Sequence, residues 1–169
     1  MNKMISIQSL LLISSFFFGS YCSKEPVNIT NDEVESASSE EIYTMLSAIN
    51  ALRASGCRCG GKWMASAPAL KWDSQLEQAA LGHARDMNNN GFFDHTGSDG
   101  SSIGTRVKRA GYNWGSVGEN IAWGYEDVPA VVEGWRVSAG HCENFMNPTY
   151  QDMGAAYING YWVQTLARH

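Results

Sequence analysis

Three residues far apart in the sequence carry side chains suited to proton transfer or metal binding. They are His95, Glu119 and His141. An imidazole exchanges its proton near neutral pH, and imidazole and carboxylate groups also bind divalent metals such as zinc. The spacing fits no short local motif, so only the fold can bring the three together. We expect them to form one cluster that solvent can reach.

Glu119 stands within the apolar segment Gly118-Glu119-Asn120-Ile121-Ala122. Burying a carboxylate alone costs several kcal/mol, so this side chain needs a partner or an open cleft. The natural partners are His95 and His141, both of which we expect in loops, where functional residues concentrate. His83 lies on the apolar face of a predicted helix and is interpreted as a hydrogen-bonded core or groove-wall histidine.

The elements that must position these residues follow from periodicity and from capping and turn signals. Antiparallel pairing comes from Asn159-Gly160, a strong hairpin signal between predicted strands 153–158 and 161–167. Residues 57–68 are expected to be a loop. Helices are predicted from about 38 to 56, from 73 or 74 to about 91, over about 102–110 and after Asp127, with a strand over 117–123. This mixture indicates an α+β fold.

Composition sets limits on function. The chain has 169 residues and a formal net charge of −5, enough length for one domain. Duplex-binding proteins carry clustered Lys and Arg, so we expect no nucleic-acid partner. Six Trp, seven Tyr and six Phe can fill a core, which excludes full disorder.

The longest apolar stretch is at the start of the chain. Lys3 precedes Ile5–Phe18, and this pattern predicts a secretory signal peptide over residues 1–21. Cys22, followed by Ser23-Lys24-Glu25, resembles the lipidated first residue of a mature bacterial lipoprotein, although signal peptidase could instead cut after it. A lipid would tether the chain to a membrane face without spanning it. We expect an extracytoplasmic protein, secreted or lipid-anchored.

Residues 22–39 contain Pro26, Asn31, several serines and acidic residues. This composition is typical of a disordered tether. The folded domain is therefore expected over residues 40–169.

Several segments together resemble a known family. They include Leu70-Lys71-Trp72-Asp73, Phe93–Gly100, Gly118–Ala122, Trp135-x-x-Ser138-x-Gly140-His141-Cys142 and Tyr161–Gln164. Each fragment is weak, but their order over about residues 42–167 is similar to the bacterial branch of the CAP superfamily, also called the SCP domain. That superfamily groups cysteine-rich secretory proteins, antigen 5 and pathogenesis-related 1 proteins.

The resemblance implies a three-layer α–β–α sandwich with a central antiparallel sheet. It also implies a groove lined by two histidines and two acidic residues. His95, Glu119 and His141 match three members of this set, and Ser138 stands where many relatives have a glutamate. Because one carboxylate is missing, we expect His95 and His141 to take up zinc only weakly.

Export permits disulfides. If Cys22 carries a lipid, three cysteines are left, which allows one bridge and one free thiol. A bridge between Cys57 and Cys59 would close a small, strained ring, so the bridge is expected to run from one of them to Cys142. Similarity to bacterial CAP sequences favours Cys59, which precedes Gly60. If no bridge formed, Cys142 could instead act with His95 in a cysteine hydrolase.

Three classes of function fit these residues. The first is a binding module whose groove takes a lipid, peptide or glycan. The second is a peptidase-like hydrolase using His95, Glu119 and His141 for acid–base or metal-assisted chemistry. The third is a structural protein of the cell envelope. The sequence identifies neither a scissile bond nor an oxyanion-stabilising group, which favours the binding module and leaves enzymatic activity open. We expect a monomer.

Overall fold

The computed structural model describes residues 39–169. The predicted signal peptide and the predicted lipidation site Cys22 lie outside the described residues, as does nearly all of the predicted tether. Within residues 39–169, no helix is both long and apolar enough to cross a membrane.

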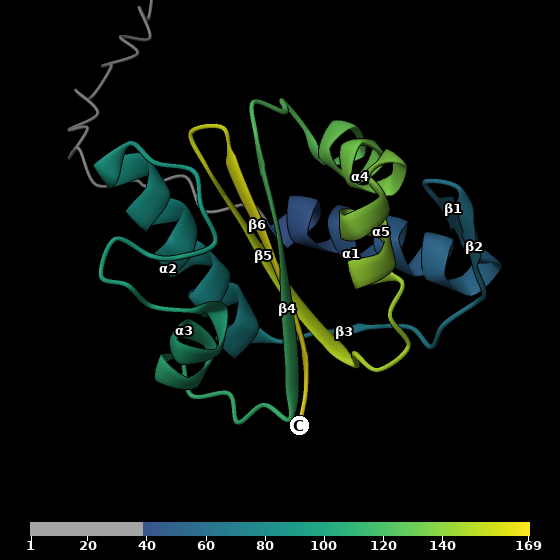
Figure 1. Cartoon of the computed structure of the whole chain (residues 1–169), viewed down its shortest axis with the longest axis horizontal. Coiled ribbons are helices and arrows are strands. Elements are labelled where there is room, and N and C mark those ends of the chain that lie inside the picture. Colours follow the sequence, from purple (N-terminus) through teal and green to yellow (C-terminus); the bar gives the residue numbers. More distant parts are fainter. Residues whose placement is uncertain (1–38) are drawn as a thin grey trace, which may run out of the picture. The chain divides into compact units, whose positions relative to one another are not determined.

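The described domain contains helices and strands in mixed order (Figure 1). The helices are α1 (Ser39–Ser55), α2 (Ser74–Asn90), α3 (Ile103–Arg109), α4 (Val128–Val137) and α5 (Ala139–Phe145). The strands are β1 (Cys57–Cys59), β2 (Lys62–Met64), β3 (Lys71–Trp72), β4 (Ser116–Trp123), β5 (Asp152–Ile158) and β6 (Tyr161–Arg168).

A four-stranded sheet in the order β3-β5-β6-β4 forms the middle layer. Helices α2 and α3 lie on one face and α1, α4 and α5 on the other (Figure 1). The three long strands are antiparallel, whereas the two-residue β3 pairs in parallel with β5. The expected α+β sandwich is therefore confirmed, and its central sheet is antiparallel except for this short parallel strand.

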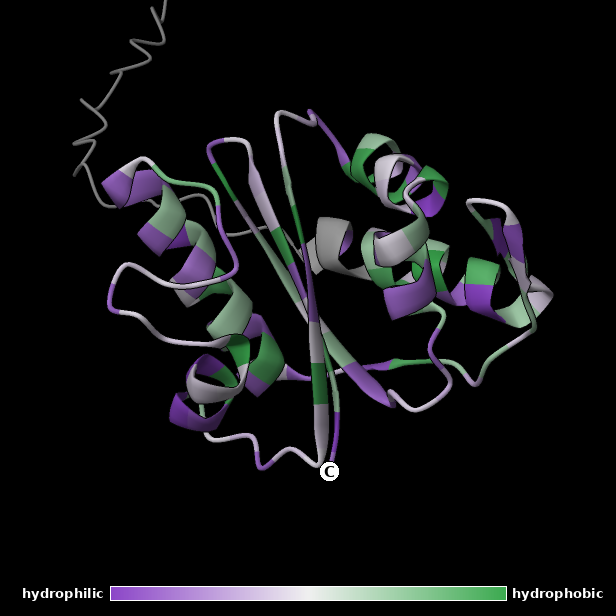
Figure 2. Ribbon diagram, viewed as in Figure 1, coloured by the Kyte–Doolittle hydropathy of each residue, from purple (hydrophilic) through white to green (hydrophobic). Residues whose placement is uncertain are grey.

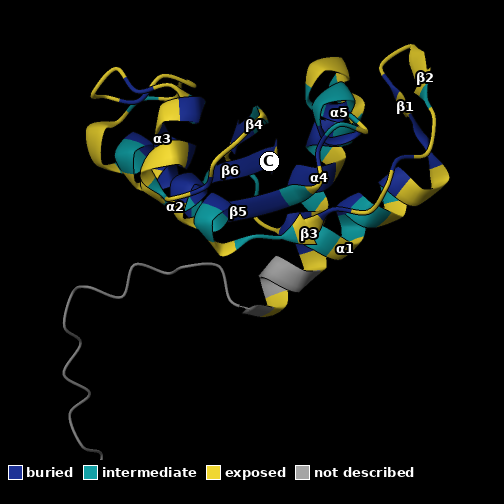
Figure 3. Cartoon of the chain, turned by 90° about the horizontal axis from the view of Figure 1, so that it is seen from below, coloured by how far each residue is buried: buried dark blue, intermediate teal, exposed yellow. Residues whose placement is uncertain are grey.

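The sheet separates two apolar cores because side chains alternate between its faces. On β6, Trp162 and Leu166 pack toward α1, α4 and α5. Val163 and Ala167 of the same strand pack toward α2 and α3. Apolar and hydrophilic residues alternate in patches along α2 and α4 (Figure 2), and strands β5 and β6 are mostly buried between the helical layers (Figure 3).

Helix α2 begins and ends with clear caps. The carboxylate of Asp73 accepts hydrogen bonds from the first-turn amides of Gln75 and Leu76, which satisfies groups that have no partner within the helix. Gly91 ends the helix with φ of 65°. At Gly154 of β5 an added Cβ would collide with the backbone of α2, so this glycine permits the close packing of helix on strand.

The segment predicted as a loop over 57–68 contains a small hairpin. Strand β1 pairs with β2 in a separate two-stranded sheet, closed by a turn at Gly60 and Gly61. Gly60 has φ of 59°, a conformation that favours glycine. Three-residue strands are too short to show periodicity, which is why the sequence did not predict them.

Arg53 of α1 is fully buried. Its guanidinium donates hydrogen bonds to the carbonyl oxygens of Pro68, Phe145, Asn147 and Tyr150, at distances from 2.6 to 3.2 Å. The side chain thereby ties α1 to the segment that follows α5. Asn147 and Tyr150 of this segment line a cavity beside β4.

Candidate functional site

A cavity of about 680 Å³ lies along the free edge of β4. Its walls come from the loop before α3, from residues 117–120 of β4, from α5 and from the segment after α5. All four residues expected to line a groove, His95, Glu119, Ser138 and His141, contribute to it. The other lining residues are Val117, Gly118, Asn120, Gly140, Glu143, Asn144, Asn147 and Tyr150. Apart from the two glycines, Val117 is the one aliphatic residue among those that line the cavity.

Glu119 is the most enclosed charge of the site. Its side chain is only 2% exposed, on the same sheet face as Ile121, which packs toward α2. One carboxylate oxygen lies 2.8 Å from Nδ1 of His95, and the other accepts a hydrogen bond of 2.8 Å from Arg106 of α3. The carboxylate therefore has partners on both oxygens, as its burial requires.

The sequence expectation for the partners of Glu119 is half right. His95 is a partner, but His141 is not among the groups bonded to this carboxylate in the described structure. The second partner is Arg106, which no pattern in the sequence indicated. A basic residue in a short helix is usually exposed, and nothing in its local pattern indicates that it turns inward toward the sheet.

His95 lies in the loop after α2, as expected, with its side chain 57% exposed. The hydrogen bond to Glu119 raises the pKa of His95 above its ordinary value of 6.5, and partial burial opposes the rise. The pair combines a buried carboxylate with a solvent-exposed imidazole. Such a pair can hold or release a proton near neutral pH.

His83 of α2 lies beneath this pair and is fully buried. Its Nε2 is 2.9 Å from the carbonyl oxygen of Asp94 and 3.9 Å from Glu119. Burial lowers the pKa of His83, although the Glu119 charge opposes this. The interpretation of His83 as a hydrogen-bonded core histidine is confirmed.

His141 stands on α5, so its prediction as a loop residue is wrong. Nδ1 of its ring lies 2.9 Å from Oγ of Ser138. Burial, and then the charge of His95, lower the pKa of His141. Helix α5 has seven residues and follows α4 after a single extended residue, Ser138; so short a helix has too little periodicity for the sequence to show it.

Asparagine side chains fasten α5 to the edge strand. Nδ2 of Asn144 donates to the carbonyl of Glu119 and to the side chain of Asn120, at 3.0 and 2.9 Å. Asn120 in turn donates to the carbonyl of His141 at 3.1 Å. Trp135 of α4 donates to the carbonyl of Ile121 at 3.4 Å. The bonds to the carbonyls of Glu119 and Ile121 satisfy backbone groups that an edge strand otherwise leaves open.

Gly118 allows this packing. An added Cβ would collide with the hydroxyl of Tyr150 and with the side-chain oxygen of Asn144. The absent side chain leaves room for both groups at the end of the cavity. The sequence signal for Asn120 and Asn144 was weak, since polar residues in a strand and at a helix end are common on surfaces.

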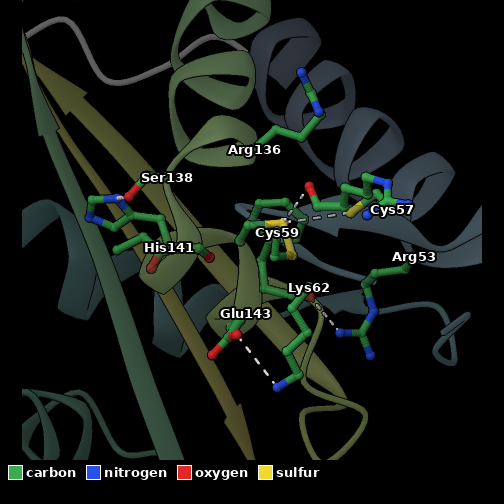
Figure 4. Close-up of a disulfide and its surroundings, with 12 residues drawn as sticks. Arg53, Cys57, Cys59, Lys62, Arg136, Ser138, His141 and Glu143 are labelled. Carbon is green, nitrogen blue, oxygen red and sulfur yellow. Dashed lines mark hydrogen bonds and ion pairs between the residues drawn. A yellow bond between two sulfur atoms is a disulfide. The ribbon is translucent and has the colours of Figure 1, made fainter. Parts of the chain in front are cut away.

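The disulfide of the domain joins Cys59 of β1 to Cys142 of α5 (Figure 4). This is the pairing that the resemblance favoured. Cys142 is fully buried, and its sulfur is committed to the bridge, which removes the cysteine hydrolase alternative. Cys57 is a buried free cysteine beside the bridge.

The donor set offers an incomplete metal site. In His95 and His141 the Nδ1 atoms face Glu119 and Ser138, which leaves each Nε2 without a partner among the described residues. However, within residues 39–169 the only three potential ligand atoms lying within 4.8 Å of one another belong to the cysteines. The histidines and Glu119 are therefore not preassembled around an ion. Weak zinc binding by His95 and His141 stays a prediction.

Comparison with known proteins identifies the family to which this domain belongs. The sequence profile of the family described as "CAP: Cysteine-rich secretory protein family" matches residues 46–166. The chain belongs to this family. The CAP resemblance noted in the sequence is thereby confirmed over most of the described domain.

Solved structures share the fold. A structure of an extracellular protein containing an SCP domain from Bacillus anthracis str. Ames superposes with a TM-score of 0.68 and 26% identity, covering 77% of this chain and 41% of that chain. An outer surface protein from Borrelia burgdorferi gives a TM-score of 0.67 at 21% identity, covering 78% of this chain and 94% of that one.

Curated relatives of this CAP domain come from Bacillus subtilis (strain 168). The uncharacterized membrane protein YlbC is 34% identical over 99 residues, which cover 59% of this chain and 29% of that protein. The uncharacterized protein YkwD is 32% identical over 97 residues, covering 56% and 38%. The chain thus spans roughly a third of the length of these relatives.

Proposed function

We propose that this CAP protein is an extracytoplasmic binding module whose cavity takes a polar ligand of the peptide or glycan class. The observation that carries the proposal is the wall itself: hydrogen-bonding side chains surround the His95–Glu119 pair, and Val117 is the one aliphatic side chain among them. An acyl chain or sterol would leave these polar groups without partners, which disfavours a lipid in this cavity.

Each wall of the cavity can contribute a different contact. His95 offers its exposed imidazole, held by Glu119. His141 and Ser138 offer a neutral imidazole and a hydroxyl. Asn147 adds an amide that can both donate and accept. Such a mixture suits the alternating donors and acceptors of a peptide backbone or a sugar ring.

The test is calorimetric titration of the protein with two probe panels, extended peptides and N-acetylglucosamine oligosaccharides. We expect a probe from one panel to bind, and His95→Ala to weaken binding at least tenfold. The control is Arg109→Ala, which removes an exposed charge outside this cavity. Binding that survives His95→Ala and His141→Ala unchanged would place the ligand elsewhere.

A lipid ligand is separable by what accompanies the purified protein. Native mass spectrometry of the chain expressed with its own signal would show an acyl lipid in the cavity as a mass increment that denaturation removes, whereas a covalent lipid on Cys22 would remain. We expect no such increment from the cavity. An increment abolished by His95→Ala would overturn the preference for a polar ligand.

The hydrolase remains the second candidate because of one observation, the 2.8 Å contact between His95 and Glu119. A carboxylate that orients an imidazole is a recurring arrangement for activating water. Turnover of a peptide or glycan that Glu119→Gln abolishes, with the protein still folded, would support this alternative. Turnover that His95→Ala and Glu119→Gln leave unaltered would exclude these residues as its source.

The third candidate is a structural role in the envelope. In that case the polar cluster would only support the fold. Substitution of His141 by Gln would then alter neither ligand binding nor turnover. We expect instead that His141→Gln weakens ligand binding without loss of the folded state.

The location belongs to the same proposal. The compared structures come from an extracellular protein and an outer surface protein, and the sequence predicts a lipid-anchored or secreted chain. Phase separation in detergent tests the anchor at Cys22: the mature protein should enter the detergent phase, and Cys22→Ser should remain in the aqueous phase. Equal partition of both would exclude the lipid.

A further inference from the structure

Two sulfur atoms on β1 face the same sulfur atom on α5. Cys57 and Cys59 are two residues apart, and both are buried while Arg58 between them is exposed. A strand with alternating side chains places both on one face. The thiol sulfur of Cys57 lies 3.6 Å from Cys142 Sγ, the sulfur already joined to Cys59 (Figure 4).

This arrangement meets the requirement for thiol–disulfide exchange, in which a thiolate attacks one sulfur of a disulfide. Attack by Cys57 on Cys142 forms a Cys57–Cys142 bond and breaks the Cys59–Cys142 bond. The electron pair leaves with the sulfur of Cys59, which takes up the proton that Cys57 lost. No oxidant or reductant is consumed.

We propose that Cys57, Cys59 and Cys142 form an internal disulfide-exchange site, in which α5 can be fastened to β1 through either of two cysteines. Because all three sulfurs are buried, an external thiol reaches them only slowly, and exchange among the three is favoured. Attack on Cys59 itself is disfavoured, since it would close the small ring between Cys57 and Cys59.

The resting state is the bridge that the structure shows. Burial raises the pKa of the Cys57 thiol, while the charge of Arg136 on α4 opposes this. A protonated thiol is a poor nucleophile, so the Cys59–Cys142 bridge persists until the thiol ionises.

Exchange would change the position of His141 in the candidate site. Cys142 follows His141 directly in α5, and the two attachment points on β1 are two residues, or about 7 Å, apart along the strand. Moving the attachment pulls on α5 and so on the position of the His141 ring. The proposal does not depend on which ligand the cavity takes.

The chain offers a direct readout of the two bridges. Trypsin cleaves after Arg58, so Cys57 falls in peptide 54–58 and Cys59 in peptide 59–62, whereas Cys142 lies in peptide 137–168. The two bridges therefore give cross-linked peptides of different mass. The experiment uses the full chain carrying Cys22→Ser, which is unfolded in denaturant at mildly acid pH with N-ethylmaleimide present, so that every free thiol is blocked before digestion.

The first variant is Cys59→Ser. We expect the folded protein to contain peptide 54–58 linked to 137–168 and to retain no free thiol. Cys57→Ser is the matched control and should contain only the link from 59–62. A folded Cys59→Ser protein in which Cys57 and Cys142 are both alkylated would overturn the proposal.

A second measurement uses the protein with all three cysteines, so the test does not depend on whether the Cys59→Ser variant folds. Prolonged incubation of the native protein with N-ethylmaleimide should trap either cysteine of β1, because exchange frees them in turn. We expect label on peptide 59–62 together with the link from 54–58. Label confined to peptide 54–58 would show that exchange does not occur.

Discussion

The cavity has two histidines on opposite walls, and their surroundings give them opposite affinity for a proton. His95 faces Glu119, and this contact raises its pKa. His141 faces the neutral hydroxyl of Ser138, and burial lowers its pKa. At a pH near 6.5 the His95 ring therefore favours the protonated form, whereas the His141 ring favours the neutral form. The comparison shows that the partner and the depth, not the residue type, decide what a histidine contributes.

The two walls are also held in different ways. The charged wall depends on ionic contacts, because Arg106 of α3 neutralises the buried carboxylate of Glu119. The neutral wall depends on a covalent bond and on amides, since the disulfide at Cys142 and the hydrogen bonds of Asn144 fix α5. Each wall can therefore be disturbed separately.

The largest effect is expected from Arg106→Met. It leaves the carboxylate of Glu119 buried with one partner fewer, and breaking a buried pair in this way costs about 3–5 kcal/mol. Urea denaturation monitored by tryptophan fluorescence measures the loss. Arg109→Met on the same helix is the control, because its pair with Asp99 is exposed and should matter little. Equal losses in both variants would refute the role given to Arg106.

The second largest loss of stability is expected from Cys142→Ala, which removes the disulfide that holds the neutral wall. The bridge joins residues 83 positions apart, and a cross-link of this span contributes about 4 kcal/mol in the chain-entropy model. Cys142→Ala prevents both bridges to β1, so dithiothreitol should lower the melting temperature of the wild type but not of this variant. A variant as stable as the oxidised wild type would contradict the expectation.

The contrast in proton affinity can be measured directly. In an NMR titration of the ring protons, the pKa of His95 should lie above 6.5 and the pKa of His141 below it. Glu119→Gln should lower the pKa of His95. The pKa of His141 should change little, with a slight rise because the repulsion by charged His95 is weaker. Coincident titration of both rings would end the distinction between the walls.

The same contrast gives opposite dependences of stability on pH. Because the pKa of His95 is raised on folding, its stabilising contribution is complete below pH 6.5 and is lost as the pH rises through the folded value. Because the pKa of His141 is lowered, it destabilises the fold as the pH falls below 6.5 toward the folded value. His141→Gln should therefore gain stability relative to wild type in acid, and His95→Gln should lose it.

The smallest effect is expected from a substitution that gives His141 the same kind of partner as His95. Ser138→Glu places a carboxylate beside His141, three residues earlier in the chain. We expect the pKa of His141 to rise toward that of His95 and zinc binding, followed by calorimetry, to strengthen. His95→Ala in the same background should remove the gain. Unchanged zinc binding would indicate that the rings do not share an ion.

Much of the fold was predictable because its signals are local and repeated. Helix α2 shows both a cap and an apolar face, and Asn159-Gly160 fixes the hairpin of β5 and β6. The elements missed are short. Helix α5 and the hairpin of β1 and β2 have seven and three residues per element, and their stability comes from packing and from the disulfide rather than from propensity.

The sequence indicated some residues of the candidate site but not the hydrogen bonds that connect them. His95, Glu119 and His141 stood out because polar groups in apolar or loop surroundings need a reason. Arg106 did not, since its role depends on a face of α3 that the sequence leaves undefined. The bond from Asn144 to the carbonyl of Glu119 likewise joins residues that only the folded sheet edge brings together.

The buried guanidinium of Arg53 has a consequence for molecular recognition. It gathers the carbonyls of Phe145, Asn147 and Tyr150 from beneath, and two of these residues border the cavity. The part of the cavity wall formed by Asn147 and Tyr150 is thus held in place by α1, a helix that does not line the cavity. Under the proposed binding function, a wall fixed in this way loses little conformational entropy when a ligand associates, because its shape is set before the ligand arrives.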